Sequence, residues 1–139
     1  MAKKYDWKLV SMLLLDFFIF SFYSMPTPFF PAIALDYGLG TTEIGLIFGT
    51  FALGSIFCSL MFGKIMSIVG KHKLLYISVT IAALSTISFG FLTQLKKSET
   101  DAFLATALVI RFVSGFMSGG VLTVICGFLP LLYRHDQVA

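Results

Sequence analysis

The sequence predicts an all-α integral membrane protein, on two observations. Of the 139 residues, 58% are hydrophobic and 12% are charged, and the mean hydropathy is +0.93. A water-soluble domain of this length needs far more polar surface. The apolar residues also gather in four long runs, each near or above the roughly 20 residues that a helix needs to cross a bilayer. Long uninterrupted runs favour helices over the short alternating strands of a membrane barrel.

The runs cover residues 9–31, 43–62, 74–92 and 102–133, and we expect one transmembrane helix from each. Connections at residues 32–42, 63–73 and 93–101 are too short for a soluble domain, so residues 1–139 are expected to form a single transmembrane domain. Pro26, Pro28 and Pro31 cluster at the far end of the first run, where they kink or end the helix. Because the connections between the runs are short, we expect the functional residues to lie in the helices.

Charge placement orients the chain, because seven Lys and Arg residues fall on one side of the predicted membrane and two on the other. By the positive-inside rule the richer side, which holds both termini, is cytoplasmic. Plasma membrane and intracellular vesicle are not distinguished. No basic patch with interleaved aromatic residues lies outside the runs, so nucleic-acid binding is not expected. The richer side carries Lys3, Lys4, Lys8, Lys64, Lys71, Lys73 and Arg134, and the other carries Lys96 and Lys97.

Two ionisable residues lie inside the runs, Asp16 in the first and Arg111 in the fourth. A charge near the bilayer centre costs about 2.5 to 3.5 kcal/mol, so such residues usually mark a solute or ion path. Tyr23 shares the helical face of Asp16, and Ser114 shares that of Arg111. We predict that these residues bind solute or protons, with Arg111 as the counter-charge of Asp16. The alternative is that Asp16 is protonated or satisfied by a neighbouring helix.

Small residues predict where helices approach each other closely. Gly45 and Gly49 lie on one face of the second run, and Gly115 and Gly119 repeat the same spacing in the fourth. The third run has only scattered Ser and Thr residues, so we expect it to be a peripheral support helix.

No covalent chemistry is predicted. Cys58 and Cys126 both lie inside predicted spans, where small packing residues are expected rather than a disulfide or metal site. No nucleophile set, phosphate-cradling loop or metal-ligand spacing is present in the sequence. We therefore expect no enzyme activity, no cofactor and no metal.

The loop and the fourth run together resemble the major facilitator superfamily of secondary transporters. Gly63 leads from a glycine-rich second helix into a basic turn with Gly70, Lys71 and Lys73, and an Arg-x-x-x-Gly motif begins at Arg111. This order resembles the first four of the usual twelve helices of that family. The resemblance implies that Gly63, Gly70, Lys71 and Lys73 form a gating loop. It also implies that Arg111 lines the central cavity, a position linked to proton coupling in antiporters.

The sequence departs from the family pattern at Ser67 and Ile68, where the family commonly has an acid and a base. The usual charge relay of the gate therefore cannot form in the same way. Ser114 likewise replaces a polar amide in the motif of the fourth helix.

An aspartate midway along the first helix, together with residues 41–49, looks most like the vesicular amine and polyamine branch of that family. In that branch the carboxylate helps to recognise a cationic substrate. The resemblance implies transport of a small, cationic organic solute, with protons as a candidate coupling ion. A complete member has two six-helix halves, so we expect a truncated N-terminal part. Its partners would then be the lipid bilayer and the remaining transporter helices or another membrane protein.

Two other classes remain open. A small multidrug-type transporter also has four helices and one acid in its first helix, and it dimerises to build its pathway; Asp16 suits this class. A non-transporting membrane subunit of a larger complex would keep the helices for packing alone. The missing charges at Ser67 and Ile68 favour the subunit, and Asp16 and Arg111 argue against it.

Overall fold

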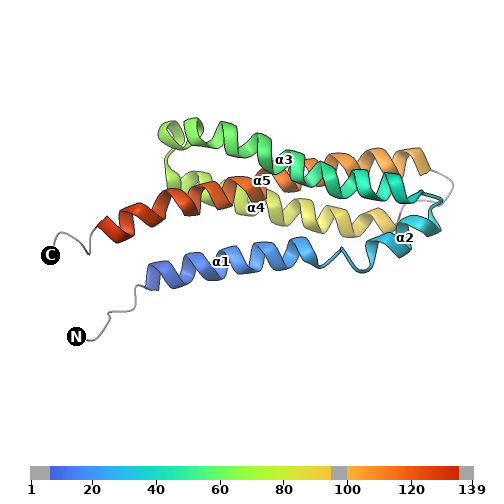
Figure 1. Ribbon diagram of the computed structural model, residues 1–139, viewed down its shortest axis with the longest axis horizontal. Coiled ribbons are helices and arrows are strands. Elements are labelled where there is room, and N and C mark those ends of the chain that lie inside the picture. Colours follow the sequence, from blue (N-terminus) through green and yellow to red (C-terminus); the bar gives the residue numbers. More distant parts are fainter. Residues whose placement is uncertain (1–6, 95–99, 135–139) are drawn as a thin grey trace.

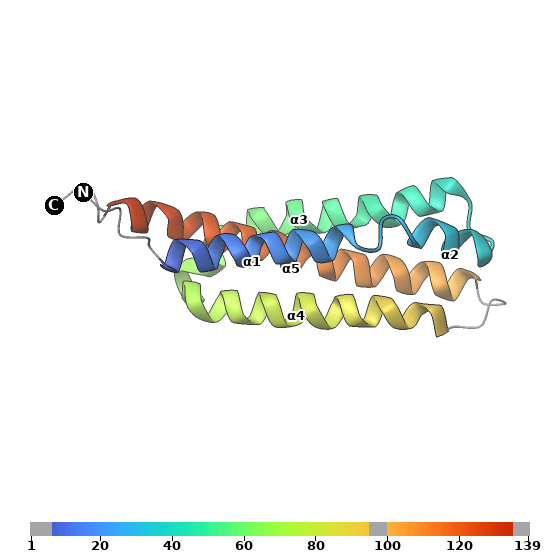
Figure 2. The same cartoon turned by 90° about the horizontal axis from the view of Figure 1, so that it is seen from below.

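The described residues form an all-α bundle whose long helices run side by side (Figure 1 and Figure 2). The computed structural model describes residues 7–94 and 100–134. Its elements are α1 (Trp7–Ser24), α2 (Phe30–Asp36), α3 (Thr41–Val69), α4 (Lys71–Phe91), the short 3-10 helix η1 (Leu92–Gln94) and α5 (Thr100–Arg134). The start of α1 and the end of α5 lie at the same end of the bundle as the junction between α3 and α4 (Figure 1).

Three of these helices are long and apolar enough to cross a membrane, namely Thr41–Val69, Lys71–Phe91 and Thr100–Phe128. A shorter apolar stretch, Val10–Ser21, lies within α1. Large apolar side chains point outward on these helices; Phe17, Leu60 and Ile87 are 64%, 72% and 59% exposed. Outward-facing apolar side chains suit a lipid environment. The all-α prediction is confirmed, and three of the four expected runs reach spanning length.

The sequence predicted one helix over residues 9–31, but the structure divides this run into two helices. α1 ends at Ser24, turns follow at residues 25–29, and α2 begins at Phe30. Pro26 and Pro28 have no backbone N–H to donate and exclude helical geometry at the residues before them, so the helical ladder stops there. Pro31 sits in the first turn of α2, where its missing donor costs nothing.

The prediction of a loop at residues 63–73 is also wrong, because α3 continues to Val69, well beyond the expected end at residue 62. Ile65 and Met66 pack against an apolar cluster that contains Phe62 and Val124, and this burial holds the extra turns in the helix. The connection is reduced to Gly70, whose φ of 89° is accessible to glycine at little cost. α4 begins at Lys71, the next residue.

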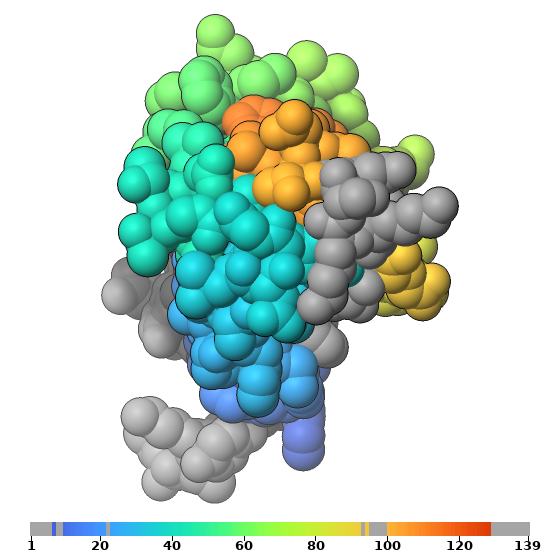
Figure 3. All heavy atoms as spheres, turned by 90° about the vertical axis from the view of Figure 1, so that its right-hand side faces the viewer, coloured from blue at the N-terminus to red at the C-terminus, as the bar shows by residue number. Residues whose placement is uncertain are grey.

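α5 is the central helix and lies between α3 and α4 (Figure 3). Its closest neighbour is α3, and glycines make the approach possible. A Cβ added at Gly115 would lie 2.8 Å from the carbonyl carbon of Phe51, and one at Gly119 would lie 2.8 Å from Cα of Ser55. Gly54 of α3 faces the backbone of Phe112 in the same way. The two helices therefore touch backbone to backbone over several turns.

The far end of the bundle is closed by aromatic packing around α2. Phe30 is buried beside Phe89 and Phe103, and the ring of Tyr37 stacks on Phe103 with centroids 4.3 Å apart. Thr100 Oγ1 donates a 3.0 Å hydrogen bond to the carbonyl of Tyr37. These contacts join the start of α5 to the segment after α1.

Candidate functional site

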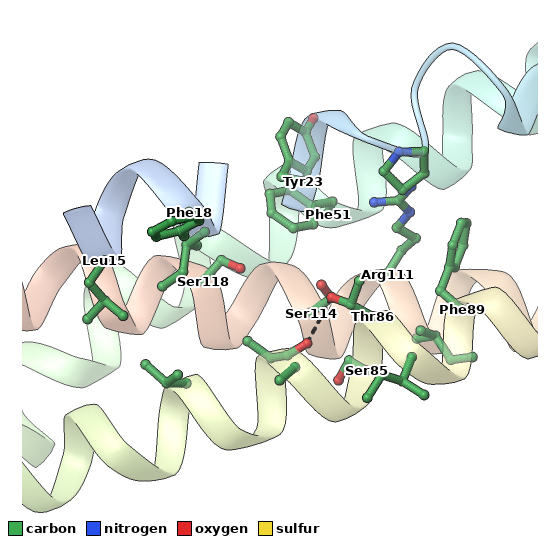
Figure 4. Close-up of a pocket in the computed structure, with 17 residues that line it drawn as sticks. Leu15, Phe18, Tyr23, Phe51, Ser85, Thr86, Phe89, Arg111, Ser114 and Ser118 are labelled. Carbon is green, nitrogen blue, oxygen red and sulfur yellow. Dashed lines mark hydrogen bonds between the residues drawn. The ribbon is translucent and has the colours of Figure 1, made fainter. Parts of the chain in front are cut away.

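A cavity of about 310 Å³ opens between α1, α4 and α5. Leu15, Phe18 and Tyr23 line it from α1, and Figure 4 shows these side chains together with Ser85, Thr86 and Phe89 of α4. Phe51 of α3 reaches the same space, and Arg111 supplies its charge. The remaining lining residues are Ile19, Pro26, Val79, Ala82, Ala83, Ser85, Thr86, Ile87, Phe89, Ile110, Ser114 and Ser118.

Arg111 projects from α5 into this region and is only 4% exposed. Its guanidinium carbon lies 4.1 Å from the ring centroid of Phe89 and 5.2 Å from that of Phe48. Both distances are within the range of a cation–π contact. Nε and Nη2 are buried without a hydrogen-bond partner among the described residues. The charge is thus stabilised by two aromatic rings while two of its nitrogen atoms stay unsatisfied.

The polar residues around the cavity supply no hydrogen-bond acceptor to Nε or Nη2 of Arg111. Tyr23 stacks on Phe51 with ring centroids 4.1 Å apart, and Ser114 is buried on α5 next to the cavity. Ser85 and Thr86 donate their hydroxyls to carbonyls of their own helix, at 2.8 and 2.9 Å. The cavity therefore combines one buried cation with walls that are mostly aromatic and aliphatic.

Asp16 is partly buried on α1, but it is not among the residues that line this cavity. No ion pair joins it to Arg111 in the described chain, and the role of Arg111 as counter-charge of Asp16 stays a prediction. Asp16 precedes Tyr23 by seven residues, which is about 10 Å of helix rise.

The expected gating-loop residues occupy three different environments. Gly63 lies inside α3, where an added Cβ would meet nothing within 4 Å, and Gly70 forms the junction. Lys73 is exposed on the first turn of α4. Lys71 instead turns inward: its Nζ donates a 2.7 Å hydrogen bond to the carbonyl of Gly127 and lies 5.4 Å from the ring centroid of Phe128. Lys71 thus attaches the start of α4 to α5.

The predicted packing glycines divide into two pairs. Gly115 and Gly119 lie against the α3 backbone, as described above. A Cβ at Gly45 or Gly49 would meet nothing within 4 Å, so these residues form no close helix contact within the described chain. They face the outside of the bundle.

Sequence reasoning missed the role of α4 and of the aromatic residues around Arg111. The sequence predicted that residues 74–92 form a peripheral support helix. That prediction is wrong, because α4 contributes seven of the residues that line the cavity. Phe48 and Phe89 contact Arg111, yet nothing distinguishes them in the sequence from the other fourteen of 16 phenylalanines. Only their position beside a buried charge gives them a role.

The described residues include no group of three or more His, Cys, Asp or Glu side chains that could hold a metal ion. Cys58 is buried in α3, and Cys126 is exposed on α5; both are free thiols in the part of the chain that the structure covers.

Ionisable residues inside a membrane bundle usually face a cavity or a partner, and many transporters place their sites between helices near the bilayer midplane. The chain matches the Major Facilitator Superfamily over residues 12–139 and belongs to that family. It is thus a multi-pass membrane protein of a transporter family and not an enzyme. The resemblance drawn from the sequence is confirmed.

Homology extends to particular transporters. The chain is similar to the rat protein MFS-type transporter SLC18B1, with 32% identity over 114 residues, or 82% of this chain and 25% of the rat protein. The mouse and human proteins of the same name are 32% and 28% identical over the same length. The chain spans about a quarter of the length of the curated relatives it matches. No solved structure matches it.

Proposed function

We propose that this chain forms part of the solute pathway of a facilitator-type secondary transporter. The observation that carries the proposal is the cavity between α1, α4 and α5, with Arg111 buried beside it. A charge placed inside a membrane bundle is costly, so such residues usually face a cavity and mark an ion or solute path. A cavity bounded by helices, with few polar groups, is also the usual form of a small-molecule site.

The pathway needs more helices than this chain contains. Members of the family place the solute between two related halves, and this chain spans about a quarter of its relatives. We propose that it corresponds to the N-terminal four helices and that further helices, in the same longer protein or a partner, complete the pathway. Gly45 and Gly49 support this proposal, because they face outward at a spacing that suits close contact with another helix.

The solute proposed is a small organic cation, recognised by the carboxylate of Asp16, with protons as coupling ion in an antiport cycle. A carboxylate in a low-dielectric environment attracts an amine strongly. Asp16 is partly buried and forms no ion pair with another described residue, so its carboxyl group is not already engaged by a cationic side chain among them.

The proposed orientation places the termini in the cytoplasm. The first residues of α1 and the last of α5 lie at the end of the bundle where Lys64, Lys71 and Lys73 also gather, next to the α3–α4 junction. Clustering of basic residues at one end predicts the cytoplasmic side. Lys96 and Lys97, which mark the opposite side in the sequence, lie outside the described residues.

Uptake into proteoliposomes tests the cationic-solute proposal, with the complete transporter that contains these helices and radiolabelled spermidine as the probe. Asp16→Asn removes the charge and preserves the size of the side chain; we expect uptake to fall at least tenfold. Asp101→Asn is the matched control, because Asp101 is exposed at the start of α5 and far along the chain from Asp16. Undiminished uptake by Asp16→Asn would contradict the assignment of Asp16.

A further inference from the structure

Lysines gather at the end of the bundle where α3 meets α4, and one of them differs from the others. Lys71 turns inward and donates to the carbonyl of Gly127. Lys64, near the end of α3, and Lys73, in the first turn of α4, are exposed. Neither side chain makes an ion pair or a hydrogen bond with another residue in the described part of the chain. These two ammonium groups are therefore available to an external anion.

The acidic residues of the described chain lie away from this end. Asp36, Glu43 and Asp101 are at the opposite end, where α2 ends and α3 and α5 begin (Figure 1). Asp16 lies inside α1, nine residues after its start, which is about 14 Å of helix rise. The positive charge at the α3–α4 end is thus not offset by any carboxylate that the structure describes there.

Exposed apolar side chains continue from each lysine along its helix. Leu60 precedes Lys64 by four residues and therefore shares its face of α3. On α4 the outward face of Lys73 also carries Tyr76 and Leu84, three and eleven residues further on. The side chains of Leu60, Tyr76 and Leu84 are all more than half exposed. Each lysine thus stands at the end of an outward apolar face that suits lipid chains.

A phospholipid matches both parts of this surface. Its phosphate accepts hydrogen bonds from ammonium groups, and its acyl chains cover apolar side chains. Lysines near helix ends lay their apolar stems along the helix and extend the charge to the headgroup level. Tyr76, with an apolar ring and a polar tip, is typical of the same level of the membrane. A soluble anion would leave the apolar faces uncovered, and a zwitterionic lipid brings no net negative charge to the two lysines.

We propose that Lys64 and Lys73 bind the phosphate headgroup of an anionic phospholipid, whose acyl chains lie along the outward faces of α3 and α4. The two helices join at Gly70 and contact each other, so both ammonium groups belong to one hairpin. Lys64 is about 8 Å of helix rise before the end of α3, and Lys73 about 3 Å after the start of α4. Both lysines therefore lie close to one level of the membrane.

This inference goes beyond the proposed solute pathway and does not rest on it. It requires only that the chain lies in a membrane, and neither Asp16 nor Arg111 takes part. Anionic lipids are concentrated in the cytoplasmic leaflet, which is the side on which the proposed orientation places the α3–α4 end.

The test is native mass spectrometry of the 139-residue chain in detergent, titrated with dioleoyl phosphatidylglycerol or dioleoyl phosphatidylcholine. The two lipids have the same acyl chains and differ in the charge of the headgroup. One basic residue near an anionic surface favours binding about fivefold, so we expect the first phosphatidylglycerol to bind about tenfold or more tightly than the first phosphatidylcholine. Added salt should lower this preference, because it screens exposed charges.

Lys64→Gln and Lys73→Gln should each lower the preference for phosphatidylglycerol about fivefold, and the double variant should remove it. Replacement of both lysines by arginine keeps the charge and the phosphate-binding donors, so this variant should retain the preference. Lys97→Gln is the matched control, because it removes an equal charge from the connection between η1 and α5. Circular dichroism shows whether each variant is folded.

Equal affinity for the two lipids in the unsubstituted chain overturns the proposal, and so does an unchanged preference in the folded double glutamine variant. A loss in Lys97→Gln as large as that in Lys64→Gln assigns the preference to net charge and overturns the site. Displacement of phosphatidylglycerol by inorganic phosphate indicates a site for anions alone and overturns the assignment to a lipid. Spermidine uptake by Asp16→Asn reports on the transport proposal, so failure of either proposal leaves the other intact.

Discussion

The two sides of α5 differ in how they meet their neighbours. Toward α3, Gly115 and Gly119 bring the two backbones into contact, and no side chain separates them. On the side that faces α1, a cavity of about 310 Å³ lies between α1, α4 and α5. There the ring of Tyr23 in α1 stacks on Phe51 of α3. Backbone contact gives a rigid pair, whereas a wall of exposed side chains beside a cavity can shift. The contrast indicates that α3 and α5 form the frame and α1 the movable wall of the site.

The largest loss of stability is expected where the backbones of α3 and α5 are in contact, at Gly115. Gly115→Val places methyl groups against the backbone of Phe51, where even a single Cβ would lie 2.8 Å from the carbonyl carbon. We expect a loss of about 3 kcal/mol in the free energy of unfolding, the upper part of the usual range for overpacking. Unfolding by SDS titration, followed by circular dichroism, measures it. Gly45→Val is the control, because a Cβ there meets nothing within 4 Å; equal losses in the two variants would contradict the frame.

A smaller effect is expected at the attachment of α4. Lys71→Gln shortens the side chain and removes the charged donor of the 2.7 Å bond to the Gly127 carbonyl. Hydrogen bonds to charged groups contribute about 1.5 to 3 kcal/mol, so we expect a loss near 2 kcal/mol by the same titration. Lys73→Gln removes an equal charge from an exposed site two residues away and should have little effect. A similar loss in both variants would assign the effect to net charge rather than to the contact with α5.

The smallest effect is expected at the movable wall. Tyr23→Leu removes the stack on Phe51, which has a 4.1 Å centroid separation and a 26° interplanar angle. Aromatic pairs contribute about 0.5 to 1.5 kcal/mol beyond their buried area, so we expect a loss of about 1 kcal/mol. Phe20→Leu, at an exposed position on α1, is the control. A loss at Tyr23 as large as that at Gly115 would place α1 in the frame.

Local sequence patterns located the spans well and their ends poorly. The runs at residues 74–92 and 102–133 correspond closely to α4 and α5, because a bilayer-length apolar run has few alternatives to a helix. The apolar run at residues 43–62 predicts a span that ends at residue 62, but α3 continues to Val69. Burial of Ile65 and Met66 keeps those turns helical, and that contact involves residues distant in the sequence.

The binding roles predicted for Asp16, Arg111, Tyr23 and Ser114 stay predictions, but the structure shows where these residues lie. Arg111 was identified because a charge inside an apolar run is conspicuous, and the structure places it at the cavity with Tyr23 and Ser114. Depth estimates from the sequence fix height along a helix to within a turn or two but not the direction of a side chain, so they could not show whether Asp16 lines the same cavity as Arg111. The inward turn of Lys71 toward Gly127 could not be predicted for the same reason.

The sequence by itself determined that the chain is a helical membrane protein of the facilitator family. Hydropathy, proline and charge act locally along the chain, so apolar runs and the Arg111 motif are readable without coordinates. Only the tertiary structure decided that Gly115 rather than Gly45 makes a close helix contact, and that Arg111 faces two phenylalanines with its donor edge unsatisfied. Those outcomes depend on which helix faces meet, and this follows from the packing of distant segments rather than from any local pattern.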